Sequence, residues 1–290
     1  NEIQEYTLSC YYGVVNCIDP TSDKDDVASI EAQTEVAKKL IQHTSYPILN
    51  RMEWLRRNTN NSNLTNQNIK FQFSNTILTS LSNLFKAWKN GNTAHLNPEA
   101  TPSELKNNNW SFWSEGTVSF GKTGDSIISS SKKIKTSAIT IGADRRTDNS
   151  RMFGVAIRLG NDDINVPRIG KEKNSLALDT VNLTLYESFL YGKDKYIDSL
   201  IGIGTFKTDI VNAVGFSSTD ATRDGKQVFA SFKVRETFKN NKLNFTPNIK
   251  LDLGFTTLSD YSEKGTANLK FNRQNIGTVI TSIGGAVDNI

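Results

Sequence analysis

The sequence lacks the features of several large protein classes. No segment approaches the roughly 20 uninterrupted apolar residues of a transmembrane helix, and only 37% of the 290 residues are hydrophobic. These two facts exclude a helical membrane protein, but not a membrane β-barrel, whose strands alternate between apolar and polar residues. The 34 lysines and arginines are nearly balanced by 30 aspartates and glutamates, so the charge does not indicate a nucleic-acid partner.

Histidine and cysteine are scarce as well. The two histidines, His43 and His95, are not spaced as metal ligands with the only cysteines, Cys10 and Cys17. We therefore expect no metal site and no cofactor. The cysteines can close a small disulfide loop in an oxidising compartment, and otherwise remain free thiols. The first residues carry no basic, apolar secretion signal, so we expect either a cytosolic protein or an internal piece of an exported chain.

Two short motifs imitate catalytic sites. Residues 116–123 (GTVSFGKT) match the phosphate-loop pattern, yet the residues inside the motif alternate like a strand and no helical pattern follows. Residues 124–127 (GDSI) resemble an esterase nucleophile block, but neither histidine has the context of a catalytic base. We predict no catalytic residues and no enzymatic activity.

Residues 22–109 have a helical pattern. Asp23, Asp25 and Asp26 follow Ser22 as in the first turn of a helix. Apolar residues then recur at helical spacing, and Pro47 is expected to kink or interrupt them before residues 48–57 continue the pattern. A second helix is predicted at residues 75–89. Its apolar stripe suits either a helix inside a pore or one packed against a neighbouring surface: Ile77, Leu81, Leu84 and Phe85.

From Trp110 onward the period falls to two, which predicts eight strands in residues 110–290. A soluble β-sandwich shows the same alternation, but three features favour a membrane barrel. The strands are long, and charges lie at mid-strand on the polar face. The connections also alternate between long (122–133, 161–175, 209–227, 256–270) and short (145–150, 190–195, 239–242). The side chains expected to line the pore are Trp113, Glu115, Arg158, Lys233, Arg235, Lys250 and Asp252. Trp110 and Phe112 are expected at the lipid interface.

These features together resemble the translocator β-barrel domain of autotransporters, the type V secretion proteins of Gram-negative outer membranes. The resemblance rests on the order and spacing of five short elements: residues 110–116 (WSFWSEG), 141–144 (IGAD), 153–156 (FGVA), Tyr186 and residues 261–265 (YSEKG). It implies an all-β fold with an α-helical N-terminal linker, as an antiparallel up-and-down barrel of twelve strands. A linker helix would occupy the pore, with the N-terminus and the passenger outside the cell. Outer-membrane lipid, the passenger, the barrel-assembly machinery and periplasmic chaperones would be its partners.

The resemblance divides the chain into a passenger remnant (1–21), a helical linker (22–109) and a partial barrel (110–290). Only eight of the twelve strands are found, and Ile290 is not the aromatic terminus of the family, so we expect the last strands to be missing. The charged pore residues either hold the linker helix, with Glu115 opposing basic side chains, or only keep the pore wall wet. The alternatives are a porin-like channel without a pore helix and a soluble β-rich adhesin or binding module.

Overall fold

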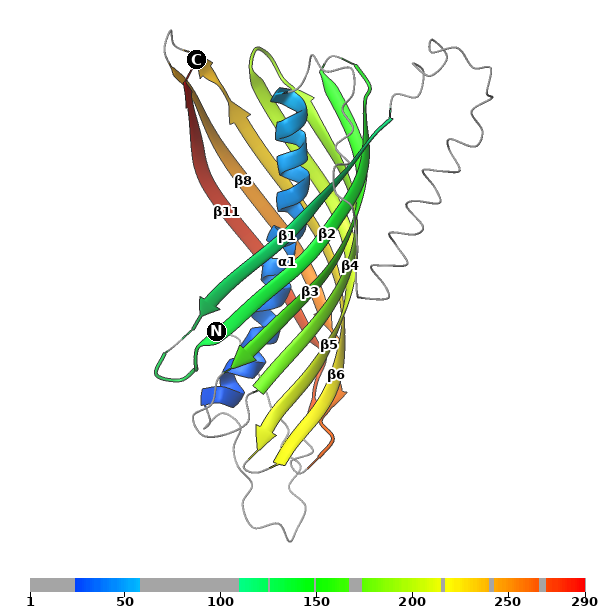
Figure 1. Ribbon diagram of the computed structural model, residues 1–290, viewed down its shortest axis with the longest axis vertical. Helices are drawn as coiled ribbons and strands as arrows, with labels where there is room; N and C mark the ends of the chain where they lie inside the picture. The colour runs from blue at the N-terminus through cyan, green and yellow to red at the C-terminus, as the bar shows by residue number, and fades with distance from the viewer. Residues whose placement is uncertain are drawn as a thin grey trace, which may run out of the picture.

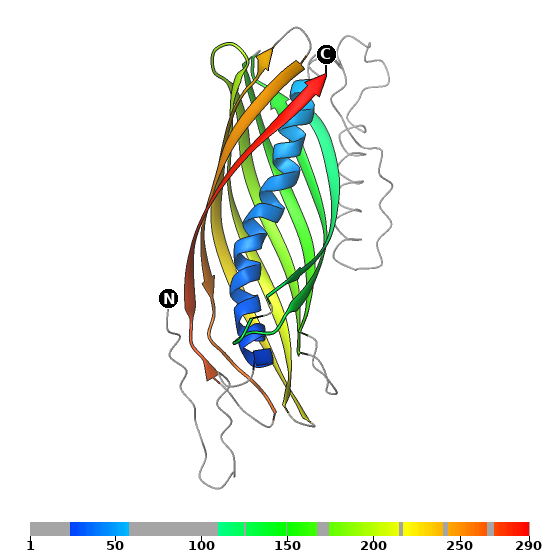
Figure 2. The same ribbon diagram turned by 90° about the vertical axis from the view of Figure 1, so that its left-hand side faces the viewer.

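The chain forms one long helix with an antiparallel sheet curved around it (Figure 1). The computed structural model describes residues 24–57 and 110–289, apart from residues 125, 149, 167–173, 215–216, 240–242 and 266–269. The helix is α1 (Lys24–Arg57), and in both views of the molecule it lies on the concave side of the sheet (Figure 2). Residues 1–23 and 58–109 lie outside the described part.

The eight predicted strands are all present, and each pairs with its neighbour in chain order. They are β1 (Trp110–Thr123), β2 (Lys132–Arg146), β3 (Arg151–Val166), β4 (Asn174–Leu190), β5 (Lys195–Val214), β6 (Ser217–Glu236), β8 (Leu243–Leu258) and β11 (Gln274–Asn289). The short β7 (Phe238–Lys239) pairs with β8, while β9 (Tyr261–Ser262) and β10 (Lys270–Phe271) pair with each other. Within the described residues no pairing joins β1 to β11, so the sheet has two open edges.

All eight strands are much longer than the usual 5–6 residues, and the longest are β5 and β6, with 20 residues each. The connection expected at residues 209–227 is therefore wrong: only residues 215–216 separate β5 from β6. Residues 209–214 and 217–227 belong to the strands, and they pair from Asp209↔Thr222 to Val214↔Ser217. Their many polar side chains suggested a loop. Some of them, such as Asp209 and Thr222, face outward beyond the apolar part of the sheet, whereas Arg223 and Gln227 are buried on the inner face.

The helix α1 runs through Pro47, so of the kink or interruption expected there the interruption does not occur. Proline in a helix interior costs about 3 kcal/mol, because it removes one backbone hydrogen bond and crowds the preceding turn. Burial of Pro47, Ile48 and Leu49 against the sheet supplies the compensating contacts. Among the described residues, no helix is long and apolar enough to cross a membrane.

The outer face of the sheet carries a continuous apolar surface, here called the apolar band. Large apolar side chains alternate with inward-facing residues in the middle of each strand, and none is covered by a second layer. They include Phe153 and Ile157 in β3, Leu183 and Leu185 in β4, Ile201 and Ile203 in β5, Val228 and Phe232 in β6, and Ile249 and Phe255 in β8. Apolar side chains exposed over so many neighbouring strands mark a surface made for hydrocarbon.

Beyond the apolar band the two faces exchange their polarity. The part of β2–β6 between the band and the connections 124–131, 167–173 and 215–216 is here called the extension. Its outer face carries polar side chains such as Asn161, Asp179 and Lys207, whereas Ile164, Leu176, Phe206, Ile210 and Ala221 are buried on its inner face. These residues form one apolar cluster with Ala32, Val36, Ala37 and Leu40 of α1. The extension is therefore built like a water-soluble domain, with its apolar residues inside.

Residues 116–123, which imitate a phosphate loop, form the second half of β1 and pair with β2 from Gly116↔Ile139 to Thr123↔Lys132. Their backbone groups are thus engaged in a sheet, and they do not surround an anion.

Candidate functional site

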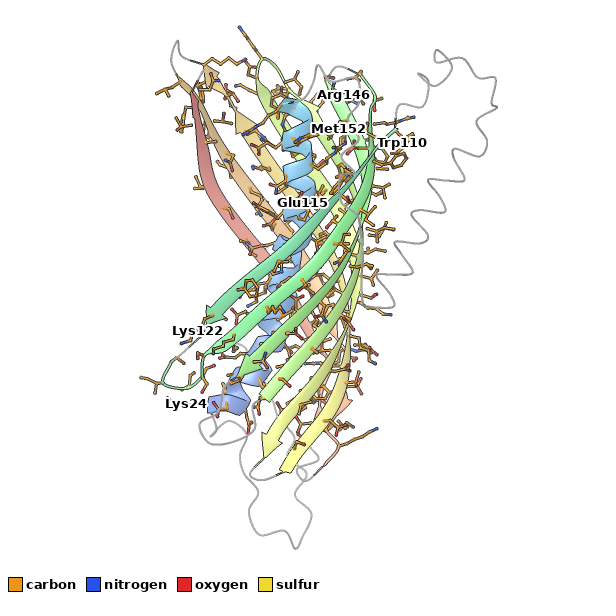
Figure 3. All side chains as sticks on the ribbon, viewed as in Figure 1. Lys24, Trp110, Glu115, Lys122, Arg146 and Met152 are labelled. Carbon is orange, nitrogen blue, oxygen red and sulfur yellow. The ribbon has the colours of Figure 1, made fainter. Side chains whose placement is uncertain are left out.

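The candidate site is the interior of the curved sheet, where α1 meets the inner faces of the strands. The helix lies along the whole interior (Figure 3): Lys24 lies near Lys122 at the hairpin end, and Arg146 and Met152 lie at the other end, here called the turn end. At the hairpin end the amide nitrogen of Ser130 donates to the Lys24 carbonyl at 3.1 Å. At the turn end the Arg146 guanidinium donates to the Leu55 carbonyl at 3.0 Å. Both ends of the helix are thus fastened to the sheet.

The strongest attachment of the helix is a buried ion pair between Arg51 and Asp144 of β2. The guanidinium donates twice to the carboxylate, from Nε to Oδ2 at 2.8 Å and from Nη2 to Oδ1 at 2.9 Å. Tyr186 also donates its hydroxyl to Asp144 Oδ2 at 2.9 Å, and Trp113 donates its indole N–H to the Tyr186 oxygen at 2.7 Å. A bidentate pair with a supported carboxylate fixes one position of the helix, because sliding α1 would leave both charges buried and unpaired.

A second buried carboxylate, Asp198 of β5, binds two arginines. Arg56 of the helix donates to Oδ1 at 2.6 Å, and Arg235 of β6 donates to Oδ2 at 2.7 Å. The Ser188 hydroxyl donates to Oδ1 at 2.6 Å. Arg235 also reaches Glu53 of the helix at 3.1 Å. This network connects one turn of α1 to three neighbouring strands, β4, β5 and β6. Arg235 therefore lies in the interior and contacts the helix.

Glu115 has a different partner from the one expected. We expected it to oppose a basic side chain, but Asn50 of the helix donates its amide to Glu115 Oε1 at 3.2 Å. An amide donor is compatible with this position because the carboxylate is only half-buried. Trp113 is 2% exposed and packs against Gly142 of the neighbouring strand, where an added Cβ would lie 2.4 Å from the indole. Only glycine leaves room for this ring.

Arg158 of β3 is fully buried but does not contact a carboxylate of the helix. It donates to the Thr180 hydroxyl of β4 at 3.0 Å. Nearby, Asp162 accepts a short hydrogen bond from Thr136. His43 of α1 lies 4.0 Å from Asp162 Oδ1. This group therefore places one helix residue beside a strand carboxylate at the level where the extension begins.

The remaining predicted pore residues lie on β6 and β8. Lys250 and Asp252 form an ion pair at 2.8 Å, with Asp252 fully buried. Lys233 is half-buried and lies opposite Asp198 in the register of β5 and β6. The apolar stripe Ile77, Leu81, Leu84 and Phe85 and the cysteines Cys10 and Cys17 all lie outside the described residues.

The residues that hold the helix were mostly missed from the sequence. Asp144 and Asp198 on the strands and Arg51 and Arg56 on α1 form the two main attachments. The sequence did contain a sign of the two aspartates, because each is a lone carboxylate on the polar face of an alternating strand. The sequence pattern does not say which helix residue a carboxylate meets, because this depends on how far α1 is inserted.

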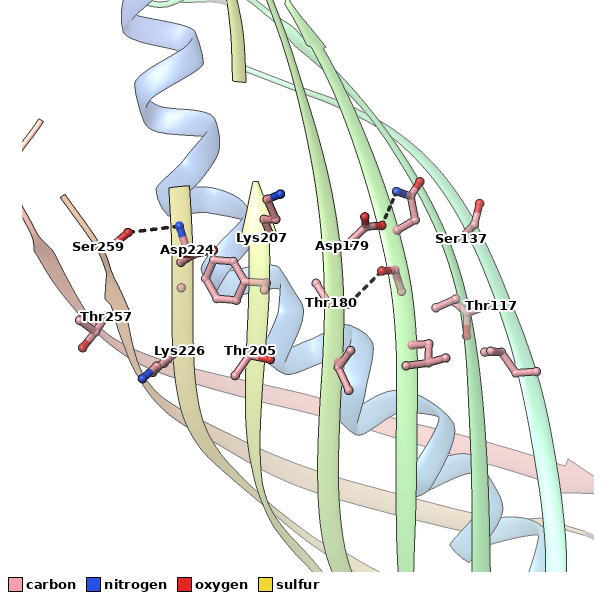
Figure 4. Close-up of a pocket in the computed structure, with 18 of the residues that line it drawn as sticks. Thr117, Ser137, Asp179, Thr180, Thr205, Lys207, Asp224, Lys226, Thr257 and Ser259 are labelled. Atoms are coloured by element: carbon pink, nitrogen blue, oxygen red, sulfur yellow. Dashed lines mark hydrogen bonds between the residues drawn. The ribbon is translucent and has the colours of Figure 1, made fainter. Parts of the chain in front are cut away.

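On the outer face, the apolar band ends at a row of polar side chains that crosses the strands (Figure 4). Thr117, Ser137, Asp179, Thr205, Lys207, Asp224, Lys226, Thr257 and Ser259 mark this line, with α1 behind the strands in this view. Beyond this line the outward side chains are mostly polar and joined by hydrogen bonds such as that from Asn161 to Asp179, at 3.0 Å, with Val118, Phe120 and Val211 as exposed apolar exceptions. This line is the boundary at which a hydrocarbon layer would give way to water.

The fold of this curved antiparallel sheet is also found in a known protein. A solved structure, the translocator domain of autotransporter NalP from Neisseria meningitidis, is similar with a TM-score of 0.51 and 15% sequence identity, over 71% of this chain and 69% of that one. At this identity the likeness concerns the fold. No curated protein matches this chain.

The match to a protein family is stronger. The family model described as autotransporter beta-domain matches residues 112–289, which is more than half of the chain and nearly all of the sheet. The match agrees with the outward apolar band and with strands paired in chain order, and it supports the expected outer-membrane location and role in protein transport. This chain therefore belongs to the autotransporter β-domain family.

Proposed function

We propose that this chain exports a passenger that precedes residue 24, and that α1 is the linker helix that remains in the pore. The observation that carries the proposal is the position of α1 inside the sheet, where Asp144 and Asp198 hold two of its arginines. A porin-like channel has no use for a helix bound along its interior. A soluble adhesin would not expose the apolar band.

The direction of the helix supports an extracellular N-terminus. Lys24 lies at the hairpin end and Arg57 near the turn end, and β1 also starts at the turn end, where Trp110 pairs opposite Arg145. In membrane barrels the short turns face the periplasm and the longer connections face outward. The helix therefore descends from the outside toward the periplasm before the chain enters β1.

Cysteine labelling tests this orientation. We would replace Cys10 and Cys17 by serine and introduce Lys122→Cys at the hairpin end or Ser150→Cys at the turn end. A membrane-impermeant maleimide added to intact cells should label the Lys122→Cys variant and should label Ser150→Cys only after the outer membrane is opened. The reverse pattern would contradict the orientation.

Export itself is tested with an epitope tag placed before Asn1. Antibody added to intact cells should bind this tag, whereas the same tag inserted after Ser150 should remain hidden until the membrane is opened. A protein that inserts correctly by the cysteine test, but keeps the N-terminal tag hidden, would contradict passenger export without contradicting the barrel.

The occupied pore is tested by cross-linking. In the cysteine-free chain, a short bis-maleimide should link Arg51→Cys of α1 to Asp144→Cys of β2, because the wild-type side chains are in direct contact and the reagent spans the length of the lost arginine side chain. The pair Arg51→Cys and Asp209→Cys is the matched control, since Asp209 faces outward on the extension. Equal cross-linking of the two pairs would contradict a helix bound in the interior.

A further inference from the structure

Two arginines stand on the outer face of the sheet beside the turn between β2 and β3. Arg145 lies opposite Phe153 in the register, and Arg151 precedes Phe153 by two residues, so the two arginines are diagonal neighbours on one face. Both side chains are exposed. Their Cα atoms are therefore roughly 7–8 Å apart, the spacing of diagonal pairs in an antiparallel sheet.

Aromatic rings hold both guanidinium groups in place. The Arg145 guanidinium carbon lies 5.6 Å from the centre of the Trp110 ring, and that of Arg151 lies 4.9 Å from the Phe189 ring. The Trp110 and Phe153 rings meet edge to face at 6.4 Å. Cations stacked on aromatic faces keep their N–H groups available at the ring edge, while the rings themselves suit the membrane interface.

The position of the arginines fits the level of lipid headgroups. Phe153 and Ile157 begin the apolar band of β3 directly after Arg151. At the other edge of the band the outward side chains include several carboxylates, among them Asp163, Asp179 and Asp224. That edge mixes carboxylates with cations such as Lys207 and Lys226, whereas the arginine pair lies at the turn end.

The carboxylates near the arginines do not neutralise them. Within the described residues neither guanidinium has a carboxylate oxygen within 4 Å. Asp148 in the turn accepts two hydrogen bonds at 2.7 Å from the amide and hydroxyl of Ser150. These bonds lower the pKa of Asp148 more than the charge of Arg151 does. Glu187, opposite Phe153 on β4, is the acidic neighbour on the same face.

We propose that Arg145 and Arg151 bind the phosphate of an anionic phospholipid whose acyl chains lie along the apolar band. Guanidinium groups bind phosphate oxygens through paired, charge-assisted hydrogen bonds, and the two arginines offer such donors on neighbouring strands at the same edge of the apolar band. The adjoining apolar band selects a lipid over a free anion, because it accommodates the acyl chains. This inference requires only that the band lies in lipid, and it is independent of passenger export.

The test is native mass spectrometry of the protein released from mixed micelles with equal amounts of phosphatidylglycerol and phosphatidylcholine. The wild-type chain should retain phosphatidylglycerol in preference to phosphatidylcholine. The Arg145→Gln/Arg151→Gln variant should lose this preference, with retention about tenfold lower, as expected for the loss of two charge-assisted contacts. Inorganic phosphate added at the concentration of the lipid should not displace it.

Two further variants keep the test decisive. Lys207→Gln/Lys226→Gln removes two outward cations at the other edge of the band and should keep the wild-type preference. Glu187→Gln removes the acidic neighbour and should raise retention about twofold, because the like charge facing the phosphate is gone. If the double arginine variant loses its strand content by circular dichroism, the single variants and Glu187→Gln decide. Unchanged retention in the arginine variants, or equal displacement by free phosphate, would overturn the proposal.

Discussion

The apolar band and the extension use the same strands and the same helix, yet they arrange polarity in opposite ways. In the band, apolar side chains such as Ile201 face outward, while Asp144 and Asp198 bind the helix inside. In the extension, Phe206 and Ile210 are packed inside against α1, while Lys207 and Asp209 face outward. The difference follows from the solvent: hydrocarbon lies outside the band and water lies outside the extension.

The comparison also shows how one helix is held by two kinds of contact. Its N-terminal half lies in the apolar cluster of the extension, with Ala32, Val36 and Leu40. Its C-terminal half also packs in an apolar cluster, with Ile48, Met52 and Leu55 against the strands. In addition it carries Arg51 and Arg56, whose partners are buried carboxylates of the band. Apolar contacts depend on area and tolerate small shifts, whereas a bidentate ion pair requires one register. The ion pairs therefore set how far the helix is inserted.

The largest effect is expected from Asp198→Ala. Removing this carboxylate leaves Arg56 and Arg235 buried without their common partner, which costs about 3–5 kcal/mol of unfolding free energy. The matched control is Asp209→Ala on the same strand, where the exposed carboxylate has only weak partners and the cost is about 0–1 kcal/mol. Urea unfolding in lipid vesicles, followed by tryptophan fluorescence, measures both. Equal effects would mean that the interior of the band is as well solvated as the surface.

The second prediction compares an inward phenylalanine of the extension with an outward phenylalanine of the apolar band. Phe206→Ala in the extension should lower the free energy of unfolding by about 3–5 kcal/mol, because the lost ring leaves a cavity that the surrounding side chains do not fill. Phe232→Ala in the apolar band should cost less, about 1.5–3 kcal/mol, because lipid chains fill the vacated space and only the transfer term is lost. The same unfolding measurement compares the two variants. A larger cost at Phe232 would contradict a lipid-facing band.

An added charge probes the outer face directly. Ile201→Arg, in the band, should lower the free energy of unfolding by about 2–4 kcal/mol, the cost of a cation near the bilayer midplane. Val211→Arg lies ten residues further along the same outward face, in the extension, and should change stability by less than about 0.5 kcal/mol. Vesicle insertion yield and urea unfolding check both. If the two variants behave alike, the boundary between band and extension is misplaced.

The smallest effect is a pH dependence at Glu263, which accepts hydrogen bonds from Asn212 and Thr219 of the extension. Burial raises the pKa of Glu263 above its ordinary value of 4.5, and Asp26 adds to the rise, against hydrogen bonds from Asn212 and Thr219. A raised folded-state pKa means that the folded protein binds the proton more tightly than the unfolded chain does. The ionised group therefore destabilises the fold above its raised pKa, and this cost disappears as the pH falls toward 4.5.

Glu263→Gln isolates this group, since the neutral amide cannot titrate. The difference in unfolding free energy between variant and wild type should change steadily in the pH range above 4.5 and level off at neutral pH. Asp260→Asn, an exposed neighbour, serves as the control. A difference that is constant with pH would show that Glu263 is not responsible.

The sequence predicted the eight strands because alternation is a local property, and Phe153, Val155 and Ile157 show it without reference to any other element. It failed at residues 209–227, where the polar side chains Asp209 and Thr222 face water and the apolar side chains Ile210 and Ala221 face the helix. The alternation continues there, but the apolar side chains now face inward and the polar ones outward. A prediction that expects apolar residues on the outer face therefore takes this stretch for a loop. These strands become recognisable only if the face that carries the apolar residues is allowed to change along a strand.

The candidate site was predictable only in part. The charged inner positions Arg158, Arg235 and Asp252 were identified by strand parity, because the face opposite the apolar residues must look inward. The pairing of Asp144 with Arg51 was not predictable, because the two residues are 93 positions apart in the sequence. Which helix residue meets the carboxylate depends on how far α1 is inserted into the curved sheet. Continuity through Pro47 depends in the same way on burial that the local sequence does not report.

The length of α1 has a mechanical consequence for whatever is joined to its first residue. Its 34 residues extend about 51 Å at 1.5 Å per residue, whereas the hydrophobic layer of an outer membrane is about 25 Å thick. Roughly half of α1 must therefore extend beyond the lipid layer, where the strands of the extension surround it. A domain tethered at Lys24 would be carried on a stiff stalk, clear of the surface, with little freedom to lie down on it.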